Sequence, residues 1–524
     1  MKKILVSLSA FIVLLLGASS WFFLSTKTTV VYEHENYDIS LRTPSYLQVR
    51  FTNERERKME NTVDRIREFD VTFFGKSSGT YSIVERTLGN QTTFLFERME
   101  NDGRKKFEVE TTFSFKDGAD LETKSWNPAV IEHAYHNTFG LDPTVNPFGR
   151  VTGNSLNMIV GHVFVSKKME KQYENGKVSR IRQLSEELRD VTVAEGQVFK
   201  SYEIDGGEVA ESWLLLSAQD LFPSEQIEND YIDFALTNQM SQLNWLTMDG
   251  PFTKLAFSIE PSTEMGYGRV IGRTQDDFAL DWHRKSESVF FETMVLNSRA
   301  NLLYYIDEFE GTRWPTEYTS TWLGNAYGVR APYVDTRYNE YVAFFLDQTV
   351  REFADDVTDA ELYVPLYADY LLSRVETGEI IEVNDGYLIV DYFDEDAETP
   401  VTHASLNHEL GGLKILLTAF QDTGDVKYMD VALKVIAGIE SFGQADGGWI
   451  RDNGDLWYQA RPDGTFSGDD YPQLTLFDLL ETQKLLEQLK LQRNVYFDEM
   501  IDAKLAYLDN EDVELIEKVR GLLE

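Results

Sequence analysis

Three stretches in the C-terminal half bring aromatic side chains together with carboxylates, amides and basic groups. They cover residues 313–341, 402–408 and 446–471. Aromatic rings stack on the apolar faces of sugars, while carboxylates and amides hydrogen-bond to sugar hydroxyl groups. The three stretches therefore predict a carbohydrate site, whose partner is a polysaccharide or another glycan containing uronic acid.

The chemistry that these side chains suit is proton transfer at an acidic sugar. Epimerising a uronic acid at carbon 5 requires two proton-transfer groups on opposite faces of the ring and a cation on the carboxylate. The predicted side chains lie at helix starts or in the loops before them, so we expect them to meet in one cleft. They are Tyr338, Tyr458 and Tyr471 for proton transfer, Arg337 and Arg461 for the carboxylate, and His403, Asn407, His408 and Trp457 for substrate binding.

Three other functions would use the same region. A polysaccharide lyase needs nearly the same groups as an epimerase. Glycoside hydrolysis needs two carboxylates about 5 to 9.5 Å apart, for which Glu340 and Asp470 are the candidates. A protein that binds or assembles envelope glycans without catalysis is the third alternative. The loop 459–461 distinguishes it, because an epimerase needs a second proton-transfer group opposite Tyr458.

Amphipathic helices are the elements that would position these side chains. Between residues 222 and 490, apolar residues recur every three or four positions. The clearest pair of helices meets at Gly424, which ends the first, and Asp425, which caps the second. Several such αα-hairpins predict an all-α (α/α) toroid over 222–490, followed by an acidic helical tail over 494–524.

Ahead of the helices, the period of the apolar residues changes to two. Over residues 70–218, aromatic and β-branched runs alternate with clusters of Gly, Ser, Asn and Asp, which predicts a β-rich domain. Residues 28–69 read as a polar spacer and a helix of dense alternating charge. The predicted fold class is thus multidomain α+β, with an N-terminal membrane anchor, a β-rich domain and then an all-α toroid.

The first residues predict a membrane segment. Lys2 and Lys3 precede an uncharged stretch over 4–24 that is long enough to cross a bilayer once, and Lys27 closes it. We expect residues 1–27 to be an uncleaved anchor of a single-pass cell-membrane protein whose remaining chain is extracytoplasmic. The alternative is a cleaved signal peptide, with a mature end near Ser20, which would make the protein secreted.

Composition excludes several classes of protein. The chain has 49 Lys and Arg against 88 Asp and Glu, a net charge of −39, which disfavours nucleic acid as a partner. No cysteine is present, so disulfide frameworks, thiolate metal sites and thiol enzymes are ruled out. We expect no cofactor and no catalytic metal. A structural calcium in the loop with Asp446, Asp452 and Asp455 is the one alternative to ordinary turn roles for these residues.

Residues 403–489 resemble the C-terminal helical domain of glucuronyl carbon-5 epimerases. The resemblance rests on the turn Thr423-Gly424-Asp425, on Trp457-Tyr458 with Pro462, and on a helix that begins near Tyr471. It implies a membrane anchor, β-rich domains, a helical toroid and tyrosines as the proton-transfer groups. This chain departs from the family pattern at residues 459–461, which are Gln, Ala and Arg where the family has acidic residues and a second tyrosine.

Overall fold

The computed structural model describes residues 25–116, 120–238, 240, 242–309, 311–354, 362–395 and 399–524. The chain divides into two compact units. The first comprises residues up to 171 together with 180–301, and the second comprises 172–179 together with 302–524. The boundary between the two main parts of the chain therefore falls within a helix, α4 (Val289–Glu308), and not near residue 220.

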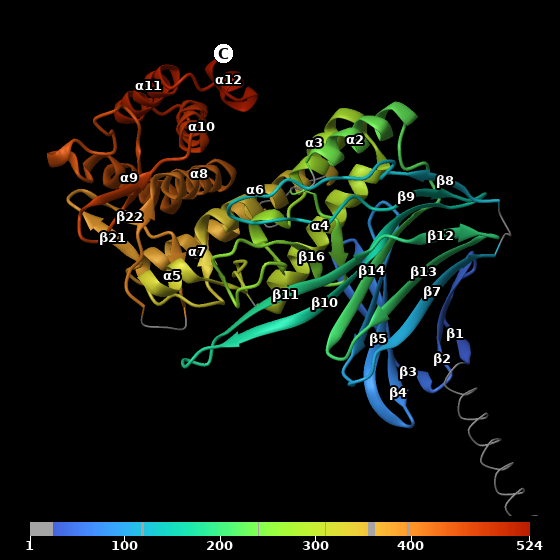
Figure 1. Cartoon of the computed structure of the whole chain (residues 1–524). Coiled ribbons are helices and arrows are strands. Elements are labelled where there is room, and N and C mark those ends of the chain that lie inside the picture. Colours follow the sequence, from blue (N-terminus) through green and yellow to red (C-terminus); the bar gives the residue numbers. More distant parts are fainter. Residues whose placement is uncertain are drawn as a thin grey trace, which may run out of the picture. The chain divides into compact units, whose positions relative to one another are not determined.

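Two antiparallel sheets form most of the first unit, and they are drawn in blue to green in Figure 1. Side chains from both sheets, such as Leu41 and Val109 of the smaller and Val71 and Leu95 of the larger, share one apolar core. The smaller sheet has the order β1 (Thr26–Glu33), β2 (Tyr37–Pro44), β7 (Phe107–Phe115), β13 (Gln197–Ile204) and β12 (Val191–Ala194).

The larger sheet ends with β3 at one edge and with short strands at the other. Its order is β15 (Trp245–Thr247), β16 (Gly250–Lys254), β18 (Gly266–Gly268), β11 (Val178–Leu188), β10 (Asn157–Gln172), β14 (Glu208–Ser217), β6 (Thr93–Asn101), β5 (Lys76–Thr87), β4 (Thr62–Phe73) and β3 (Leu47–Met59). Strand β9 (Gly149–Thr152) pairs with β10 and with β8 (Glu122–Ser125), and β17 (Ile259–Glu260) completes the strands of this unit.

The predicted spacer and charged helix over 28–69 are wrong, because these residues form strands β1 to β4. The alternating charges of β3 and β4 pair across an antiparallel hairpin, with Arg67 Nε 2.7 Å from Glu54 Oε2 and Arg57 Nη2 3.0 Å from Asp64 Oδ2. Opposite charges facing each other across two strands stabilise a hairpin as i,i+4 pairs stabilise a helix. Among the described residues, the β-rich part therefore begins at Thr26.

Helices and an aromatic cluster complete the first unit. Helix α2 (Glu225–Thr237) follows β14, and helices α3 (Asp277–Ser286) and α4 follow β18, with the 3-10 turn η2 (Ile271–Arg273) before α3. Rings of these helices pack with one another and with Trp126, which follows β8: Tyr231 is edge-on to Phe291 at 5.0 Å, and Trp126 is edge-on to Phe290 at 5.5 Å.

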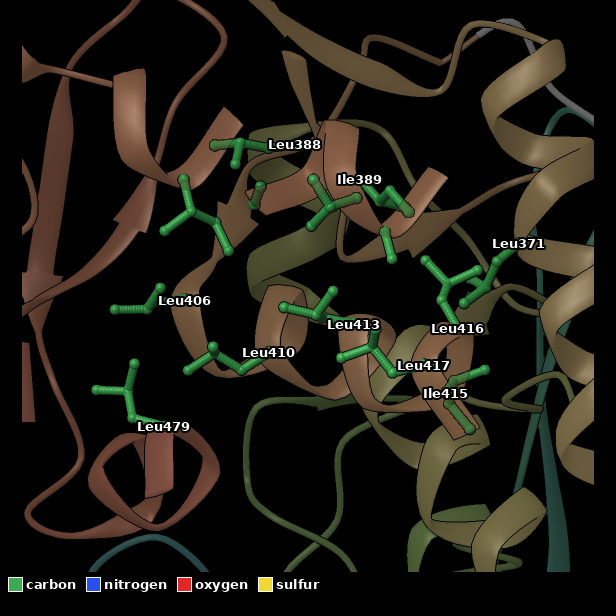
Figure 2. Close-up of a cluster of buried hydrophobic side chains, with 14 of the residues drawn as sticks. Leu371, Leu388, Ile389, Leu406, Leu410, Leu413, Ile415, Leu416, Leu417 and Leu479 are labelled. Carbon is green, nitrogen blue, oxygen red and sulfur yellow. The ribbon is translucent and has the colours of Figure 1, made fainter. Parts of the chain in front are cut away.

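The second unit is built around helix α8 (Leu406–Thr423), which packs against four helices. These are α6 (Thr336–Phe353), α7 (Tyr363–Glu376), α9 (Val426–Ser441) and α10 (Leu474–Gln488). Figure 2 shows Leu410, Leu413 and Leu417 of α8 in one apolar cluster with Leu388 and Ile389. Full burial of one such side chain contributes about 1.5–3 kcal/mol, so this core holds the helix starts in place.

The remaining elements of this unit include short sheets as well as helices. The helices are α5 (Thr321–Ala326), α11 (Val495–Asn510) and α12 (Glu517–Leu523), with the 3-10 turn η4 (Gln444–Asp446). Strand β20 (Val334–Asp335) pairs with β23 (Tyr392–Phe393), β21 (Ile380–Val383) pairs with β22 (Gly386–Ile389), and β24 (Ala404–Ser405), β25 (Trp457–Ala460) and β26 (Phe466–Asp469) form a three-stranded sheet. Strand β19 (Thr319–Ser320) precedes α5.

These short sheets correct the predicted fold class. The region over 222–490 is not all-α, because strands β15 to β26 lie within it between the helices. The local prediction of a helical pair is confirmed: α8 ends at Gly424, whose φ is 70°, and Asp425 accepts a hydrogen bond from the Lys427 N–H at 3.0 Å.

The predicted membrane anchor falls on residues 1–24, which lie outside the described residues. Over the part of the chain that is described, no helix combines the length and the apolar character needed to span a bilayer. The fold class that the structure supports is a β-rich first half followed by helices with short sheets. None of its described helices is a membrane anchor. The location of the protein stays a prediction.

Candidate functional site

Two buried polar clusters lie at the starts of helices in the second unit. The Arg337 cluster consists of Arg337, Glu340 and Tyr341 of α6, Lys414 of α8, and Asp478 and Glu481 of α10. The His403 cluster consists of Asp391, His403, Ser405 and His408 with the rings of Trp322, Tyr327, Tyr392, Tyr458 and Tyr471.

In the Arg337 cluster, each nitrogen of the guanidinium is used by the protein. Nε donates to the Tyr341 hydroxyl at 2.8 Å, and Nη1 donates to Glu340 at 2.7 Å and to the Asn407 carbonyl at 3.0 Å. Nη2 donates to both carboxylate oxygens of Asp478, at 2.9 and 3.0 Å. Arg337 therefore has no nitrogen left for the substrate carboxylate that the sequence assigns to it.

Lys414 closes this cluster from the side of α8. Its ammonium lies 3.2 Å from Glu340, 2.8 Å from Asp478 and 2.9 Å from Glu481. Burial by itself lowers the pKa of Lys414, but these carboxylates outweigh it and raise the pKa above the usual value. Both Lys414 and Glu340 are buried, so the cluster is a closed ionic network that joins α6, α8 and α10.

Asp470, the other carboxylate predicted for hydrolysis, belongs to a separate contact. Its Oδ2 accepts from Lys504 of α11 at 2.8 Å, and its Oδ1 accepts from the Thr475 hydroxyl at 2.5 Å. Lys504 also donates to Asp455 at 2.5 Å. Asp470 thus fastens α11 to the loop before α10, and neither it nor Glu340 is free to act on a glycosidic bond.

The polypeptide around Asp391 brings the His403 cluster together. Asp391 precedes β23, His403 precedes β24, and His408 lies in the first turn of α8. The Asp391 carboxylate accepts hydrogen bonds from the Ser405 N–H at 2.7 Å and from the Ser405 hydroxyl at 2.5 Å. The Asp391 N–H donates to the His403 carbonyl at 3.0 Å, so the two segments are held in register.

The two histidines face the same carboxylate. Nε2 of His403 lies 3.0 Å from Asp391 Oδ2, and Nδ1 of His408 lies 3.7 Å from Oδ1 and 2.8 Å from the Thr336 hydroxyl. Burial lowers the pKa of His408 to about 4, so this ring is neutral at pH 7. Burial by itself raises the pKa of Asp391, but His408, His403 and the hydrogen bond from Ser405 lower it below the usual value, so the group is ionised.

Aromatic rings enclose His403. Tyr327 stacks on the imidazole at 5.6 Å, Trp322 meets it edge-on at 5.2 Å, and Tyr392 lies 5.6 Å away. Tyr458 lies 6.5 Å from it. The imidazole is fully buried, and within the described part of the chain neither ring nitrogen has a well-aligned hydrogen-bond partner.

The outer rings of the cluster reach solvent. Trp322 is 47% exposed and Tyr471 is 48% exposed, and Tyr471 meets Tyr458 edge-on at 5.6 Å. Burial raises the pKa of the Tyr458 phenol well above its usual value, and the charge of Asp391 adds to this. The Tyr458 hydroxyl is therefore a neutral donor at pH 7. Half-exposed rings beside buried polar groups suit the apolar face and the hydroxyl groups of a sugar.

Arg461 carries a cation beside these rings. Burial raises the pKa of Tyr327, and the nearby Arg461 charge partly opposes that rise, which places the guanidinium within electrostatic reach of the phenol. The Arg461 residue is exposed, and its side chain has no hydrogen-bond or ion-pair partner among the residues described. Unlike Arg337, it is available to an anion.

Three further predicted residues lie apart from the rings or between the clusters. Trp457 precedes Tyr458 on β25, and since successive strand residues face opposite sides, it stacks on Phe466 at 6.1 Å and not on His403. Tyr338 lies in the first turn of α6, with its N–H donating to Asp335 at 3.1 Å. The Asn407 carbonyl contacts Arg337, and its side-chain oxygen is buried without a partner in the described structure.

Sequence reasoning missed Asp391, the carboxylate that organises the site. The predicted stretch over 313–341 contains Trp322 and Tyr327, but neither was assigned a role. The signal was present: Asp391 directly follows the apolar run over 388–390, and an acidic residue at the end of a buried strand is a typical site residue. Over the described ranges, no group of three or more His, Asp or Glu side chains could hold a metal ion. Asp455, a candidate for calcium, is paired with Lys504.

No protein-family model matches the chain, and no curated protein matches its sequence. Among solved structures, it is similar to a D-mannose isomerase with 14% identity and a TM-score of 0.32, covering 45% of this chain and 57% of that one. A cellobiose 2-epimerase from Bacillus thermoamylovorans has 14% identity and a TM-score of 0.37, with 55% and 71% covered. A family 76 glycoside hydrolase from a bovine Bacteroides thetaiotaomicron strain has 13% identity and a TM-score of 0.36, with 68% and 76% covered.

Proposed function

We propose that the second unit binds a carbohydrate at the His403 cluster and that the protein is a carbohydrate-active enzyme. The observation that carries this proposal is the enclosure of an Asp391–His403 pair by aromatic rings, of which Trp322 and Tyr471 are half-exposed. Rings of this exposure provide stacking area for a sugar, while the buried pair provides a polar group beneath them.

We further propose an acidic sugar as the substrate and epimerisation next to its carboxylate as the reaction. The unpaired guanidinium of Arg461 would bind the carboxylate, since an arginine presents two parallel N–H donors to it. His403, held against Asp391, would take the proton from one face of carbon 5, and the neutral phenol of Tyr458 would supply a proton to the opposite face. Since His403 is fully buried, a covering ring must move before it reaches substrate.

The burial of His403 also favours a second candidate function, glycan binding without catalysis. In that case the sugar contacts the rings and Arg461, and the Asp391–His403 pair only supports the wall of the site. Hydrolysis by Glu340 and Asp470 has no comparable support, because each carboxylate is neutralised by protein cations.

One experiment separates these functions. The full chain is incubated in deuterated water with polymers of glucuronic, mannuronic and galacturonic acid and with neutral hexose polymers as the control. Deuterium at carbon 5 without cleavage is the result expected for an epimerase, whereas new unsaturated ends indicate a lyase and new saturated reducing ends a hydrolase. Binding without any of these products supports the non-catalytic function. The carbohydrate proposal is overturned if the protein neither binds nor converts any of the polymers.

A further inference from the structure

The end of the hairpin formed by β10 and β11 belongs to the second unit. Residues 172–179, which we call the hairpin end, group with residues 302–524, while the rest of both strands lies in the first unit. Lys177 and Ser179 of the hairpin end are buried, so they pack inside the protein. None of the residues proposed for sugar binding comes from the hairpin end.

A loop over residues 319–331, which we call the ring loop, carries two rings of the candidate site and is closed at its base. The Thr319 hydroxyl accepts a hydrogen bond from the Ala331 N–H at 2.9 Å, so the two ends of the loop lie side by side. Between them, α5 carries the half-exposed Trp322, and Tyr327 follows α5. Both rings contact the buried imidazole of the site. The position of the base therefore determines where the two rings stand.

Two side chains of the hairpin end bind the base of the ring loop. Oγ of Ser179 accepts a hydrogen bond from the Thr319 N–H at 2.9 Å. Nζ of Lys177 donates to the Pro332 carbonyl at 3.1 Å and to the Arg330 carbonyl at 3.4 Å. The hairpin end thus holds the chain on both sides of the ring loop.

Lys177 also pairs with Asp394, which connects the ring loop to a third ring. The Asp394 carboxylate forms an ion pair with the ammonium, and its Oδ2 accepts a hydrogen bond from the Arg330 N–H at 3.3 Å. Both charged side chains are buried, and among the described residues no other cation pairs with Asp394. Asp394 follows β23, whose Tyr392 lies 5.6 Å from the imidazole of His403. One ammonium therefore joins the base of the ring loop to the strand that carries Tyr392.

These polar contacts restrict the ring loop more than its apolar contacts do. The loop shares only a small apolar cluster, whose buried members are Leu323, Val329, Ala331 and Tyr333. Apolar contacts are not directional, whereas hydrogen bonds from one ammonium to several acceptors require a defined geometry. A binding site needs its contacting groups held within about 0.5 Å of the productive geometry by supporting contacts of this kind.

We propose that the hairpin end is a positioning element of the carbohydrate site and that Lys177 is its positioning residue. Lys177 holds the base of the ring loop against Asp394, so that the exposed ring of Trp322 stands where a sugar can stack on it. Lys177 does not itself contact the sugar. This inference rests on the proposed carbohydrate site, to which it adds a contribution from the β-rich part of the sequence.

The test removes the ion pair without leaving a buried charge. Lys177→Met by itself would leave the Asp394 carboxylate buried and unpaired, so it is combined with Asp394→Asn, which keeps an oxygen for the Arg330 N–H. The polymer is the uronic-acid or hexose polymer that the unsubstituted protein binds most tightly. We expect the double variant to bind it about two- to tenfold more weakly, as loss of the Trp322 ring would.

The matched control is Lys168→Met combined with Glu100→Gln. Lys168 lies on β10 and forms a more exposed ion pair with Glu100, outside the hairpin end. We expect this variant to bind the polymer as the unsubstituted protein does. Circular dichroism and urea unfolding check the fold and stability of every variant. Equal losses of affinity in the control and in the double variant contradict the proposal.

A spectroscopic measurement follows the ring itself and needs no glycan. The protein is labelled with 5-fluorotryptophan, and Trp322→Phe assigns the fluorine resonance of residue 322. This resonance should shift or broaden in the Lys177→Met, Asp394→Asn variant, while the resonances of the tryptophans in the first unit stay unchanged. An unchanged resonance of residue 322 overturns the proposal. If the double variant does not fold, Ser179→Ala, which removes only the acceptor of the Thr319 N–H, should produce the same changes in its place.

The failure of this inference differs from the failure of the proposed function. If the unsubstituted protein binds the polymer and the double variant binds it equally well, only the positioning role of Lys177 is overturned. If the unsubstituted protein binds no polymer, the carbohydrate site is overturned together with the role of Lys177 in it.

Discussion

The Arg337 cluster and the His403 cluster lie in the same unit and both include a residue of α8, yet their bonding differs. In the first, Glu340 and Asp478 pair with both Arg337 and Lys414, and a hydroxyl and a carbonyl take the remaining donors of Arg337. In the second, a single ionised carboxylate, Asp391, faces two histidines, and aromatic rings supply the remaining contacts. The comparison teaches that the saturation of polar groups, rather than their presence, separates a structural network from a candidate site.

This difference has energetic consequences. Removing one partner of a buried ionic network leaves an uncompensated charge in the interior, which costs about 3–5 kcal/mol. The exposed side chains of the His403 cluster make few contacts within the protein, so their loss should affect ligand binding and not folding. Substitutions in the Arg337 cluster should therefore change stability most, and substitutions of exposed residues in the His403 cluster should change ligand binding.

Arg337→Met should lower the free energy of unfolding by about 3–5 kcal/mol, because Glu340 and Asp478 then stay buried without their cation. Urea unfolding measures the change. Arg461→Met is the matched control and should change stability by less than about 0.5 kcal/mol, since its guanidinium is exposed. Similar losses in both variants would mean that the two arginines do not differ as described.

His408 should make stability depend on pH. Its pKa is about 4 in the folded protein and 6.5 when unfolded, so the unfolded state binds more protons between these values. The stabilisation from the neutral buried ring is complete above pH 6.5 and is lost as the pH falls towards 4, by about 3 kcal/mol. Between pH 4 and 7, the free energy of unfolding of His408→Gln should rise less steeply with pH than that of the unsubstituted protein. Parallel slopes would place the titration elsewhere.

Trp322→Ala should weaken glycan binding by about two- to tenfold, because it removes a half-exposed ring of the His403 cluster. Calorimetric titration with the polymer that binds best in the panel provides the measurement. Tyr135→Ala, at an exposed aromatic residue of the first unit, is the control and should have no effect. A loss of binding in the control, or unchanged binding in Trp322→Ala, contradicts the placement of the site.

Arg461→Lys should weaken binding of uronic-acid polymers by a few fold and leave binding of neutral polymers unchanged. Lysine keeps the charge but loses the pair of parallel donors that a carboxylate accepts from. The same titration, run with acidic and neutral polymers, compares the change in affinity for the two kinds of polymer. Equal changes for both polymers would remove the acidic-sugar part of the proposal and leave the carbohydrate site itself standing.

Much of the local structure could be predicted. The apolar stripe of α8, with Gly424 after it and Asp425 before α9, predicts a helical pair that the structure contains. The period-two runs over 70–218 predict the strands found there. The charged residues of β3 and β4 misled the prediction, since alternating charge is compatible with pairing along one helix or across two strands.

Part of the candidate site could also be predicted, because residue types that suit sugars cluster in a few loops. Tyr458, Tyr471, His403, His408 and Arg461 were identified from the sequence, and the structure places them at or beside the His403 cluster. Asp391 was missed, since a single carboxylate after an apolar run is ambiguous without knowledge of its partners.

What the sequence determined by itself is local: helix and strand periodicity, turn residues, and the residue types available for chemistry. These depend on contacts between residues a few positions apart, which the order of residues specifies directly. Only the tertiary structure decided which charges are free. Arg337 is saturated by Asn407 and Asp478, which lie 70 and 141 positions away in the chain, whereas Arg461 is not. Such pairing follows from how α6, α8 and α10 pack, and no local sequence pattern predicts it.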